Sequence, residues 1–255
     1  MSTSPGGATS ISAFFPAFND AENLRVQIPR TFETLQQLTT DFEVIVVDDG
    51  STDTTSTVLD SLRRQFPSLR MVRHPHNLGY GAALQSGFSN SIKELIFYTD
   101  GDCQYDVREL ERLLEKLSSD VDVVTGFKIK RADSAHRTIV GKLYHRVVKI
   151  FFRLRVKDVD CDFRLIRRRV MEAISLTSRT GAICVDLMCQ IERSGYWVVE
   201  VPVNHYPRLH GRSQFFRVGP VARMVVDIFR LWVQLILLKR NRSTGGNPRS
   251  AQEIH

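Results

Sequence analysis

The first half of the chain alternates short apolar runs with longer segments in which apolar residues recur every three or four positions. The runs are too short for helices and predict strands at Ile11–Phe15, Val44–Val47, Leu69–Arg73, Leu95–Thr99 and Val121–Thr125. The segments between them predict helices at Ala21–Leu38, Thr54–Phe66, Gly81–Ile92 and Asp106–Leu117, the last opened by a capping box of Asp106 and Glu109. This strict alternation predicts the α/β class, with a doubly wound, mostly parallel sheet and flanking helices.

The second half is less regular, although the same patterns continue. They predict a basic amphipathic helix at Ala135–Phe152, a strand at Phe163–Ile166, a helix at Ile183–Arg193, a strand at Trp197–Val201 and a final helix at Val218–Leu238. We therefore expect a single domain over residues 11–240. The flanking residues 1–10 and 241–255 are polar and rich in small residues, so we expect disordered tails there.

The composition is that of a soluble globular protein with an excess of positive charge. The chain has a formal net charge of +7 and an isoelectric point near 9.4, which favour an anionic partner. The aromatic residues expected on a basic face that stacks on nucleic-acid bases are not evident, so the sequence argues against nucleic acid. Its four cysteines form no Cys-x-x-Cys pair, which argues against a zinc cage or a disulfide framework and for a reducing cytosolic setting.

Carboxylates follow two of the predicted strands directly. Asp48 and Asp49 end one strand region, and Asp100 and Asp102 end another. Open parallel sheets bind ligands at the carboxyl ends of their strands, so we expect these side chains to converge. Residues two apart in an extended chain share a face, so Asp100 and Asp102 can hold one Mg²⁺ or Mn²⁺, with Gly101 allowing a ligand to approach. The alternative interpretation of such a short motif is a solvated turn.

The segment that contains Asp49 has two interpretations. One of the paired carboxylates can accept hydrogen bonds from a base or a ribose, whereas Ser51, Thr52 and Asp53 are residues that commonly cap a helix. We expect both to hold, with Asp49 facing the ligand and the later residues starting the next helix.

Three segments that follow strands, taken together, resemble a known family. Pro16-Ala17-Phe18-Asn19-Asp20, Val47-Asp48-Asp49-Gly50-Ser51 and Asp100-Gly101-Asp102 resemble, in order and spacing, glycosyltransferase family 2 with its GT-A fold. The resemblance is strongest to the branch that includes dolichyl- and polyprenyl-phosphate mannosyl- and glucosyltransferases. Asn77–Ala83, Asp158–Arg164 and Glu200–Val203 are also similar to that branch, and the resemblance spans Ile11 to Leu238.

The resemblance implies a set of site residues. It implies that the nucleotide is held by Pro16, Phe18, Asp20, Val47 and Asp49, and that the metal and diphosphate are held by Asp100, Asp102 and Gln104. Gly101 belongs to the donor-binding residues. Arg208 and Ser213 match a loop that closes over the donor phosphates, and the neighbouring Gln214 is assigned to the same donor site. Lys128 matches a position that serves donor and acceptor, and Arg137 matches a basic residue near the acceptor phosphate.

Several positions depart from the family pattern. Phe18 stands where Tyr is usual, Asp20 where Glu is usual, and Lys128 where polyprenyl-phosphate enzymes carry Arg, whose bidentate fork lysine cannot reproduce. Gln214 replaces a lysine of the mannosyl branch. These changes leave the donor chemistry in place but do not support a dolichyl-phosphate mannose synthase assignment.

Asp186 aligns with an acidic residue that serves as general base in relatives with hydroxyl acceptors. A phosphate acceptor is already anionic and needs no strong base, so Asp186 then has only a positional role. The remaining interpretation is a carboxylate on a helix face near Arg193.

The predicted function is an inverting transfer of a sugar from a nucleotide-diphosphate sugar, with Mg²⁺ or Mn²⁺, to a lipid phosphate. Transfer to a hydroxyl of a glycolipid or saccharide through Asp186 is the alternative. A sugar-nucleotidyltransferase is a different class, but the segment Pro16–Leu24 lacks the Gly-rich phosphate loop that class requires. The oligomeric state is not indicated.

The expected location is peripheral, on the cytosolic face of a membrane. The longest apolar stretch near the end of the chain, Leu231–Leu238, is far shorter than the roughly 20 residues that span a bilayer. The predicted helices at Ala135–Phe152 and Val218–Leu238 combine apolar stripes with basic residues, as interfacial helices do, although such stripes can also cover a sheet.

Overall fold

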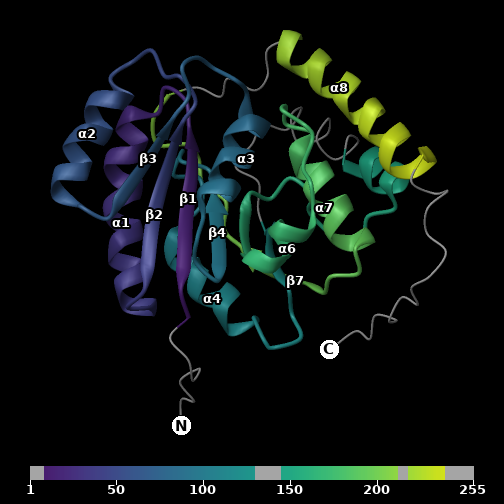
Figure 1. The fold of residues 1–255 in the computed structure, drawn as a ribbon, viewed down its shortest axis with the longest axis horizontal. Coiled ribbons are helices and arrows are strands. Elements are labelled where there is room, and N and C mark those ends of the chain that lie inside the picture. Colours follow the sequence, from purple (N-terminus) through teal and green to yellow (C-terminus); the bar gives the residue numbers. More distant parts are fainter. Residues whose placement is uncertain (1–8, 130–144, 212–217, 239–255) are drawn as a thin grey trace.

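The computed structural model describes residues 9–129, 145–211 and 218–238, and in these ranges a seven-stranded mixed sheet lies between two layers of helices (Figure 1). The strands are β1 (Ile11–Ala17), β2 (Phe42–Asp48), β3 (Leu69–Arg73), β4 (Leu95–Thr99), β5 (Val123–Lys128), β6 (Phe163–Arg167) and β7 (Val198–Val203). The helices are α1 (Ala21–Leu38), α2 (Thr55–Gln65), α3 (Tyr80–Asn90), α4 (Leu110–Glu115), α6 (Arg168–Ala173), α7 (Ile183–Arg193) and α8 (Val218–Trp232). A 3₁₀ turn, η1 (Val107–Glu109), precedes α4, a π-helical segment, η2 (Val233–Leu238), continues α8, and residues 145–152 are also helical.

The strand order is β3-β2-β1-β4-β6-β5-β7. The strands β3, β2, β1 and β4 run parallel, β5 and β7 are parallel to each other, and β6 is antiparallel to both β4 and β5. The register places Ala17 beside Asp48, so that β1 and β2 end at the same edge of the sheet. This topology confirms the predicted fold class.

The two faces of the sheet are covered by different helices. Phe15 and Val46 face α1, α2 and α4, while their chain neighbours Phe14 and Ile45 face α3 and α7 (Figure 1). Successive side chains of a strand point to opposite faces, and here helices bury both faces of the central strands. This is why the strand segments are continuously apolar rather than alternating with polar residues.

The predicted elements agree with the structure in most positions. Ala21–Leu38, Leu69–Arg73, Leu95–Thr99 and Ile183–Arg193 match to the residue, whereas the predicted strand Val121–Thr125 begins two residues later and runs to Lys128. The short helix α6 was missed because it directly continues β6 with no turn residue between them. Of the predicted helix Ala135–Phe152, residues 145–152 are helical and residues 135–144 lie outside the described ranges.

The predicted capping box is half wrong. Asp106 does cap η1, since its side chain accepts a hydrogen bond from the backbone N–H of Arg108 at 3.1 Å. Glu109, however, does not reach back to Asp106, and its carboxylate accepts from the backbone and side-chain amides of Asn204 instead. Glu109 is buried beside the end of β7, where these amides require an acceptor, so the tertiary partner replaces the local one.

No helix in the described ranges is both long enough and apolar enough to cross a bilayer. The predicted tails fall mostly outside these ranges. Ser10, which we placed in the first tail, accepts a hydrogen bond from the backbone of Glu94 and so lies beside β4.

Candidate active site

Polar residues far apart in the chain meet beyond the carboxyl ends of β1 and β4. Arg208 joins them, since its guanidinium contacts Asp20 Oδ1 at 3.3 Å and Asp102 Oδ2 at 2.7 Å. The Asp102 side chain is 6% exposed and that of Arg208 is 25% exposed. Three residues predicted for the donor site therefore form one contiguous cluster at the predicted edge of the sheet.

Asn19 ties the loop after β1 to the loop after β2. Its φ angle of 55° places it in the left-handed region, which Asn tolerates better than most residues. In this position its side-chain oxygen accepts from the backbone N–H groups of Thr52 and Asp53, at 2.8 and 3.2 Å, and its own N–H donates to Ser51. The predicted capping role therefore falls to Asp53 alone, which accepts from the N–H of Thr55 at 2.9 Å, while Ser51 and Thr52 bond to Asn19.

The Asp100-Gly101-Asp102 turn is pressed against the end of β1. A Cβ atom at Gly101 would lie 3.1 Å from the carbonyl oxygen of Pro16, so any larger residue would push the turn away from the strand. Tyr80, at the start of α3, donates its hydroxyl to Asp100 Oδ1 at 2.8 Å. The backbone N–H of Gln104 donates to Asp102 Oδ1 at 3.0 Å, so both carboxylates are oriented before any ligand arrives.

The charges at this turn are unbalanced in favour of a cation. Burial and the neighbouring carboxylates of Asp162 and Asp102 raise the pKa of Asp100 well above its ordinary value. Burial also raises the pKa of Asp102, and the Arg208 guanidinium opposes that rise. Oxygen-only ligands that carry this much uncompensated negative charge suit a hard divalent cation, so the residues fit Mg²⁺ or Mn²⁺.

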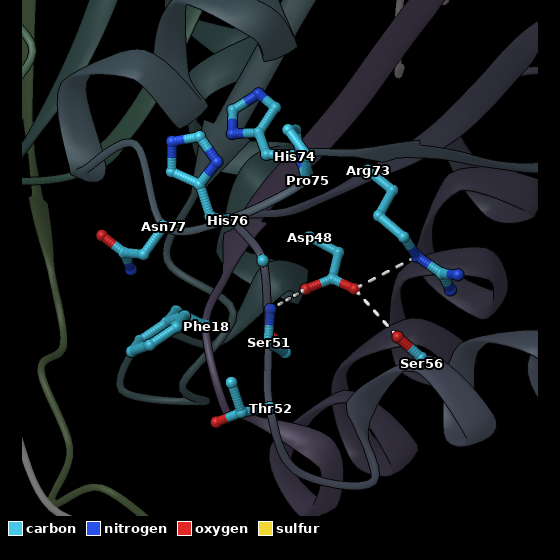
Figure 2. Close-up of a pocket in the computed structure, with 11 residues that line it drawn as sticks. Phe18, Asp48, Ser51, Thr52, Ser56, Arg73, His74, Pro75, His76 and Asn77 are labelled. Atoms are coloured by element: carbon cyan, nitrogen blue, oxygen red, sulfur yellow. Dashed lines mark hydrogen bonds and ion pairs between the residues drawn. The ribbon is translucent and has the colours of Figure 1, made fainter.

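A cavity of about 560 Å³ opens beside Phe18 at the end of β2 (Figure 2). It is lined by Phe18, Asp48, Gly50, Ser51, Thr52, Ser56, Arg73, His74, Pro75, His76 and Asn77. Asp48 is held at its wall by the N–H of Ser51, the hydroxyl of Ser56 and an ion pair with Arg73 at 3.5 Å. An aromatic ring opposite polar groups is a suitable environment for a nucleobase.

Asp49 does not line this cavity. Its two oxygens accept from the backbone N–H groups of Leu78 and Gly79, both at 2.9 Å, and from a ring nitrogen of His74 at 2.6 Å. Gly79 has a φ angle of 99°, which glycine adopts readily. The carboxylate that borders the cavity is thus Asp48, while Asp49 shapes the loop that leads to α3.

Lys128, at the end of β5, lies in a second polar group. Its ammonium contacts the carbonyl of Asp160 at 2.6 Å and the carboxylate of Asp158 at 3.3 Å. Burial disfavours the charged lysine, but Cys161 and the nearby Asp158 and Asp160 outweigh it and raise the pKa of Lys128. A cavity of about 580 Å³ adjoins it, lined by Phe127, Lys128, His145, Arg146, Lys149, Ile150, Lys157 and Asp158.

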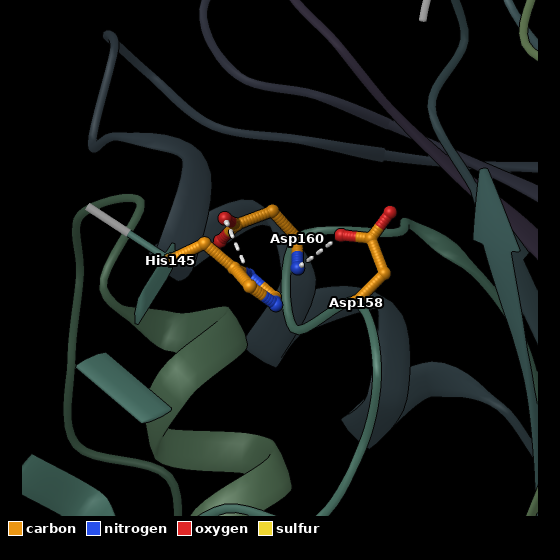
Figure 3. A group of neighbouring side chains, drawn as sticks. All are labelled: His145, Asp158 and Asp160. Atoms are coloured by element: carbon orange, nitrogen blue, oxygen red, sulfur yellow. Dashed lines mark hydrogen bonds and ion pairs between the residues drawn. The ribbon is translucent and has the colours of Figure 1, made fainter. Parts of the chain in front are cut away.

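The same region contains a possible metal cluster of His145, Asp158 and Asp160, whose ligand atoms lie within 4.8 Å of one another (Figure 3). Lys128 already pairs with Asp158, so a divalent cation here would have to displace or tolerate an ammonium group. The Asp100 and Asp102 turn, which has an arginine on one side only, is the better candidate metal site.

Asp186 is fully buried in α7. It accepts from the backbone N–H groups of Thr177 and Ser178, at 2.8 and 3.2 Å, and from the side-chain amide of Gln190 at 2.7 Å. These bonds make Asp186 the anchor of the loop before α7.

Other predicted site residues are placed as follows. Gln104 points to the loop after β7, where its side-chain amide donates to the carbonyl of Tyr206 at 3.0 Å. Val47 and Pro16 are paired opposite each other in the sheet, and neither lines the cavity beside Phe18. Arg137, Ser213 and Gln214 lie outside the described residues.

Two residues that were not predicted for the site, Tyr80 and Asp162, contact it. Tyr80 orients Asp100, and Asp162 accepts from the Cys184 thiol at 3.2 Å, pairs with Arg164 at 3.5 Å and raises the pKa of Asp100. Both residues fall in segments that carry the family resemblance, which was the available signal. Their roles depend on contacts between strands and helices that no local pattern contains.

Comparison with known families agrees with this geometry. The profile of the family described as Glycosyl transferase family 2 matches residues 12–175. The chain belongs to this family. The family 2 match covers β1 to β6 and therefore includes the Phe18, Asp49 and Asp102 segments.

Two curated relatives extend the match beyond that region. The chain is 30% identical over 249 residues to Glycosyltransferase AglD of Haloferax volcanii, which covers 92% of this chain and 40% of that protein. It is 28% identical over 206 residues to an undecaprenyl-phosphate 4-deoxy-4-formamido-L-arabinose transferase of Aeromonas hydrophila subsp. hydrophila, covering 80% of this chain and 62% of that protein. The chain thus spans less than two thirds of the length of these relatives.

Solved structures share the fold. Glucosyl-3-phosphoglycerate synthase from Mycobacterium tuberculosis, in complex with Mn²⁺, uridine diphosphate and glucosyl-3-phosphoglycerate, superposes with a TM-score of 0.69 at 16% identity, over 92% of this chain and 86% of that chain. The same enzyme with Mg²⁺ and uridine diphosphate gives a TM-score of 0.67 at 14% identity, over 89% of this chain and 79% of that chain. At this identity the likeness establishes the fold alone.

Proposed function

We propose that this family 2 chain is a metal-dependent, inverting glycosyltransferase that uses a nucleotide-diphosphate sugar. The observation that carries the proposal is the convergence of Asp20, Asp102 and Arg208 beside the Asp100-Gly101-Asp102 turn. The paired carboxylates suit a divalent cation, and the guanidinium lies within reach of the same point. The positive charges of the cation and of the guanidinium would both oppose the negative charge on a leaving nucleotide diphosphate.

The residues divide the donor between them. The cavity beside Phe18 and Asp48 receives the nucleoside, and Asp49 keeps the neighbouring loop in shape. Asp100 and Asp102 would hold a divalent cation, which would supply Lewis-acid stabilisation of the leaving diphosphate. Arg208 moves from Asp102 to a phosphate oxygen when the donor binds, since a doubly charged diphosphate offers it more acceptors than one carboxylate.

The favoured acceptor is a lipid phosphate. The cavity beside Lys128 is lined by further basic side chains, including Arg146, Lys149 and Lys157, and the named activity of the Aeromonas relative involves undecaprenyl phosphate. A phosphate is already a nucleophile at neutral pH, so the acceptor needs orientation and charge neutralisation rather than a base. Arg137 is proposed to assist there on the strength of the resemblance alone.

Transfer to a hydroxyl through Asp186 is the second candidate. It is the weaker one, because a base needs a free oxygen at the reacting centre. Both oxygens of Asp186 accept hydrogen bonds from Thr177, Ser178 or Gln190, and its side chain has no exposed surface.

We further propose peripheral contact with the cytosolic face of a membrane. Large apolar side chains are exposed on the helical residues 145–152 and on α8, namely Val147, Ile150, Phe151, Val225, Val226 and Phe229. The two helices touch through Phe151 and Trp232, whose ring centroids are 5.9 Å apart. Exposed basic residues such as Arg146, Arg223 and Arg230 lie on the same helices, as in interfacial helices.

A donor screen tests the proposal. The melting temperature is measured with a panel of nucleotide-diphosphate sugars, with and without Mn²⁺, because a ligand stabilises the state that binds it. A donor that stabilises the protein only with metal is then supplied with a short polyprenyl phosphate, and the glycosylated lipid is assayed. No metal-dependent stabilisation by any donor would reject the proposal, while pyrophosphate release from a sugar phosphate and a nucleoside triphosphate would indicate a nucleotidyltransferase.

A further inference from the structure

The segment Asn204–His210, here called the strap, leaves β7 and carries Arg208 to the carboxylates. Its position is unusual for a loop, because hydrogen bonds from other elements hold it on both sides of Arg208. We propose that Asn23 and Gln104 are positioning residues that latch the strap, so that Arg208 is presented to the donor site by two side-chain amides remote from it in sequence.

The first latch is at Tyr206. The backbone N–H of Tyr206 donates to the backbone carbonyl of Gln104 at 2.8 Å, and the side-chain amide of Gln104 donates to the carbonyl of Tyr206 at 3.0 Å. One residue of the Asp102 turn therefore satisfies both backbone groups of one strap residue. This contact also ties the strap to the same turn that carries Asp102.

The second latch is at His210. The side-chain oxygen of Asn23 accepts from the N–H of His210 at 3.2 Å, and its side-chain nitrogen donates to the carbonyl of His210, also at 3.2 Å. A carboxamide is the side chain that offers a donor and an acceptor in one plane, so it can pair with a backbone residue as a strand does. Asn23 is only 2% exposed and also donates to Asp20 Oδ1 at 3.0 Å.

The two latches leave a short bridge from Pro207 to Leu209 between them. Pro207 fixes its own φ angle, so the bridge has few conformations once its ends are held. Arg208 lies at its centre and reaches Asp20 on one side and Asp102 on the other. Asn23 thus acts through Arg208, since it orients both the strap and Asp20, to which Arg208 binds.

Limited proteolysis measures the latch directly. Trypsin cuts after Arg208 only when the strap opens, and when opening is fast the cleavage rate follows the population of the open form. Loss of one or two hydrogen bonds predicts about 5- to 30-fold faster cleavage between Arg208 and Leu209 in Asn23→Ala. Gln104→Ala tests the other latch in the same way, and hydrogen exchange of the His210 amide should rise in Asn23→Ala by a similar factor.

Gln85→Ala is the matched control. Gln85 also donates its side-chain amide to a backbone carbonyl, that of Ser178 at 2.7 Å, but on another loop. Cleavage after Arg208 should be unchanged in this variant. The latch is rejected if cleavage after Arg208 is unaltered in both Asn23→Ala and Gln104→Ala, or if it accelerates equally at every basic site, which would report global unfolding.

A kinetic measurement rests on the proposed function. In Asn23→Ala we expect the kcat/KM for the donor to fall by about tenfold, because Arg208 must be ordered at the moment of transfer. The protease measurement tests the latch, and the kinetic measurement tests the role of the latch in transfer, so either can be rejected without the other. If cleavage after Arg208 accelerates but the protein has no transferase activity, the latch is supported and the proposed function is rejected. If cleavage accelerates but kcat/KM is normal, the positioning role of Asn23 is rejected.

Discussion

Arg208 and Asp102 form an ion pair of 2.7 Å although 106 positions separate them in the chain. The guanidinium thereby occupies one oxygen of a carboxylate that is proposed to bind the metal. The guanidinium partly offsets the effect of burial on Asp102, and it lies beside the carboxylates at which the diphosphate is proposed to bind. Under the proposed function, donor binding would only exchange the partners of groups that are already assembled, which limits the reorganisation needed before transfer.

Asp102→Asn should severely reduce metal-dependent transfer while leaving the fold intact. The substitution keeps the shape of the side chain but removes a negative charge, so leaving-group stabilisation is lost and kcat should fall by about 100-fold or more. The melting temperature should change little, because Asp102 contacts Arg208 and the Gln104 amide rather than the apolar core. Near-normal turnover with Mg²⁺ in this variant would show that the metal assignment is wrong.

Arg208→Ala should weaken catalysis more than stability. The side chain is partly exposed and contacts carboxylates at the site, so its removal should reduce kcat/KM for the donor by about 100-fold. Arg208→Lys is the informative comparison, because lysine keeps the charge but loses the planar fork, and it should recover only part of the activity. A fall in melting temperature with unchanged activity would make Arg208 a structural residue.

Glu43 should contribute to stability at neutral pH and lose that contribution in acid. Burial alone would raise the pKa of this carboxyl, but hydrogen bonds from Ser12, the Ile92 N–H and Arg70 lower it below the ordinary value of 4.5. A carboxyl whose folded pKa is depressed stabilises the protein above 4.5, and the effect disappears as the pH falls through the lowered folded value.

The variant Glu43→Gln should therefore be less stable than the wild type at pH 7, by about 1.5–3 kcal/mol, and the difference should shrink below pH 4.5. Urea unfolding at several pH values measures it. Glu94→Gln is the control, because the Glu94 side chain is 60% exposed in its pair with Arg167 and an exposed pair contributes little. A stability difference independent of pH would mean that Glu43 acts through packing alone.

Membrane contact is tested by flotation with liposomes. We expect binding to vesicles with anionic lipids and release at raised ionic strength, since each basic residue near such a surface contributes roughly 1 kcal/mol. Phe229→Ser, which removes an apolar side chain that is 64% exposed on α8, should reduce flotation without reducing the melting temperature. Absence of binding to both anionic and neutral vesicles would leave a soluble acceptor and favour the hydroxyl mechanism.

The sequence predicted the helices and strands better than it predicted which side chains contact one another. Apolar runs identify β1 to β4 because strands buried on both faces have a strong local signature, and the rule for parallel sheets then locates the edge at which Asp102 lies. The choice between Asp48 and Asp49 was not accessible in this way. Adjacent residues at a strand end point in different directions, and which of them meets the cavity depends on the loop at Leu78 and Gly79.

Gln104 shows the same limit at a longer range. Its position two residues after Asp102 favours a metal ligand, yet its amide bonds to Tyr206 on the segment after β7. The direction of β6 was likewise invisible, because an antiparallel strand buried on both faces has the same composition as a parallel one. Contacts between segments that are distant in the sequence could be identified only from the structure.

The reversed strand β6 also has a consequence for how this architecture can diversify. β5 ends, and β6 begins, at the edge of the sheet that carries Asp100 and Asp102, so the stretch 129–162 is attached to the sheet on that side at both ends. Insertions, deletions and exchanges in this stretch would therefore change the surroundings of that edge without changing the pairing of any strand. Under the proposed function, most of the residues that line the acceptor cavity come from this stretch, so a change of acceptor would leave the carboxylates at the ends of β2 and β4 in place.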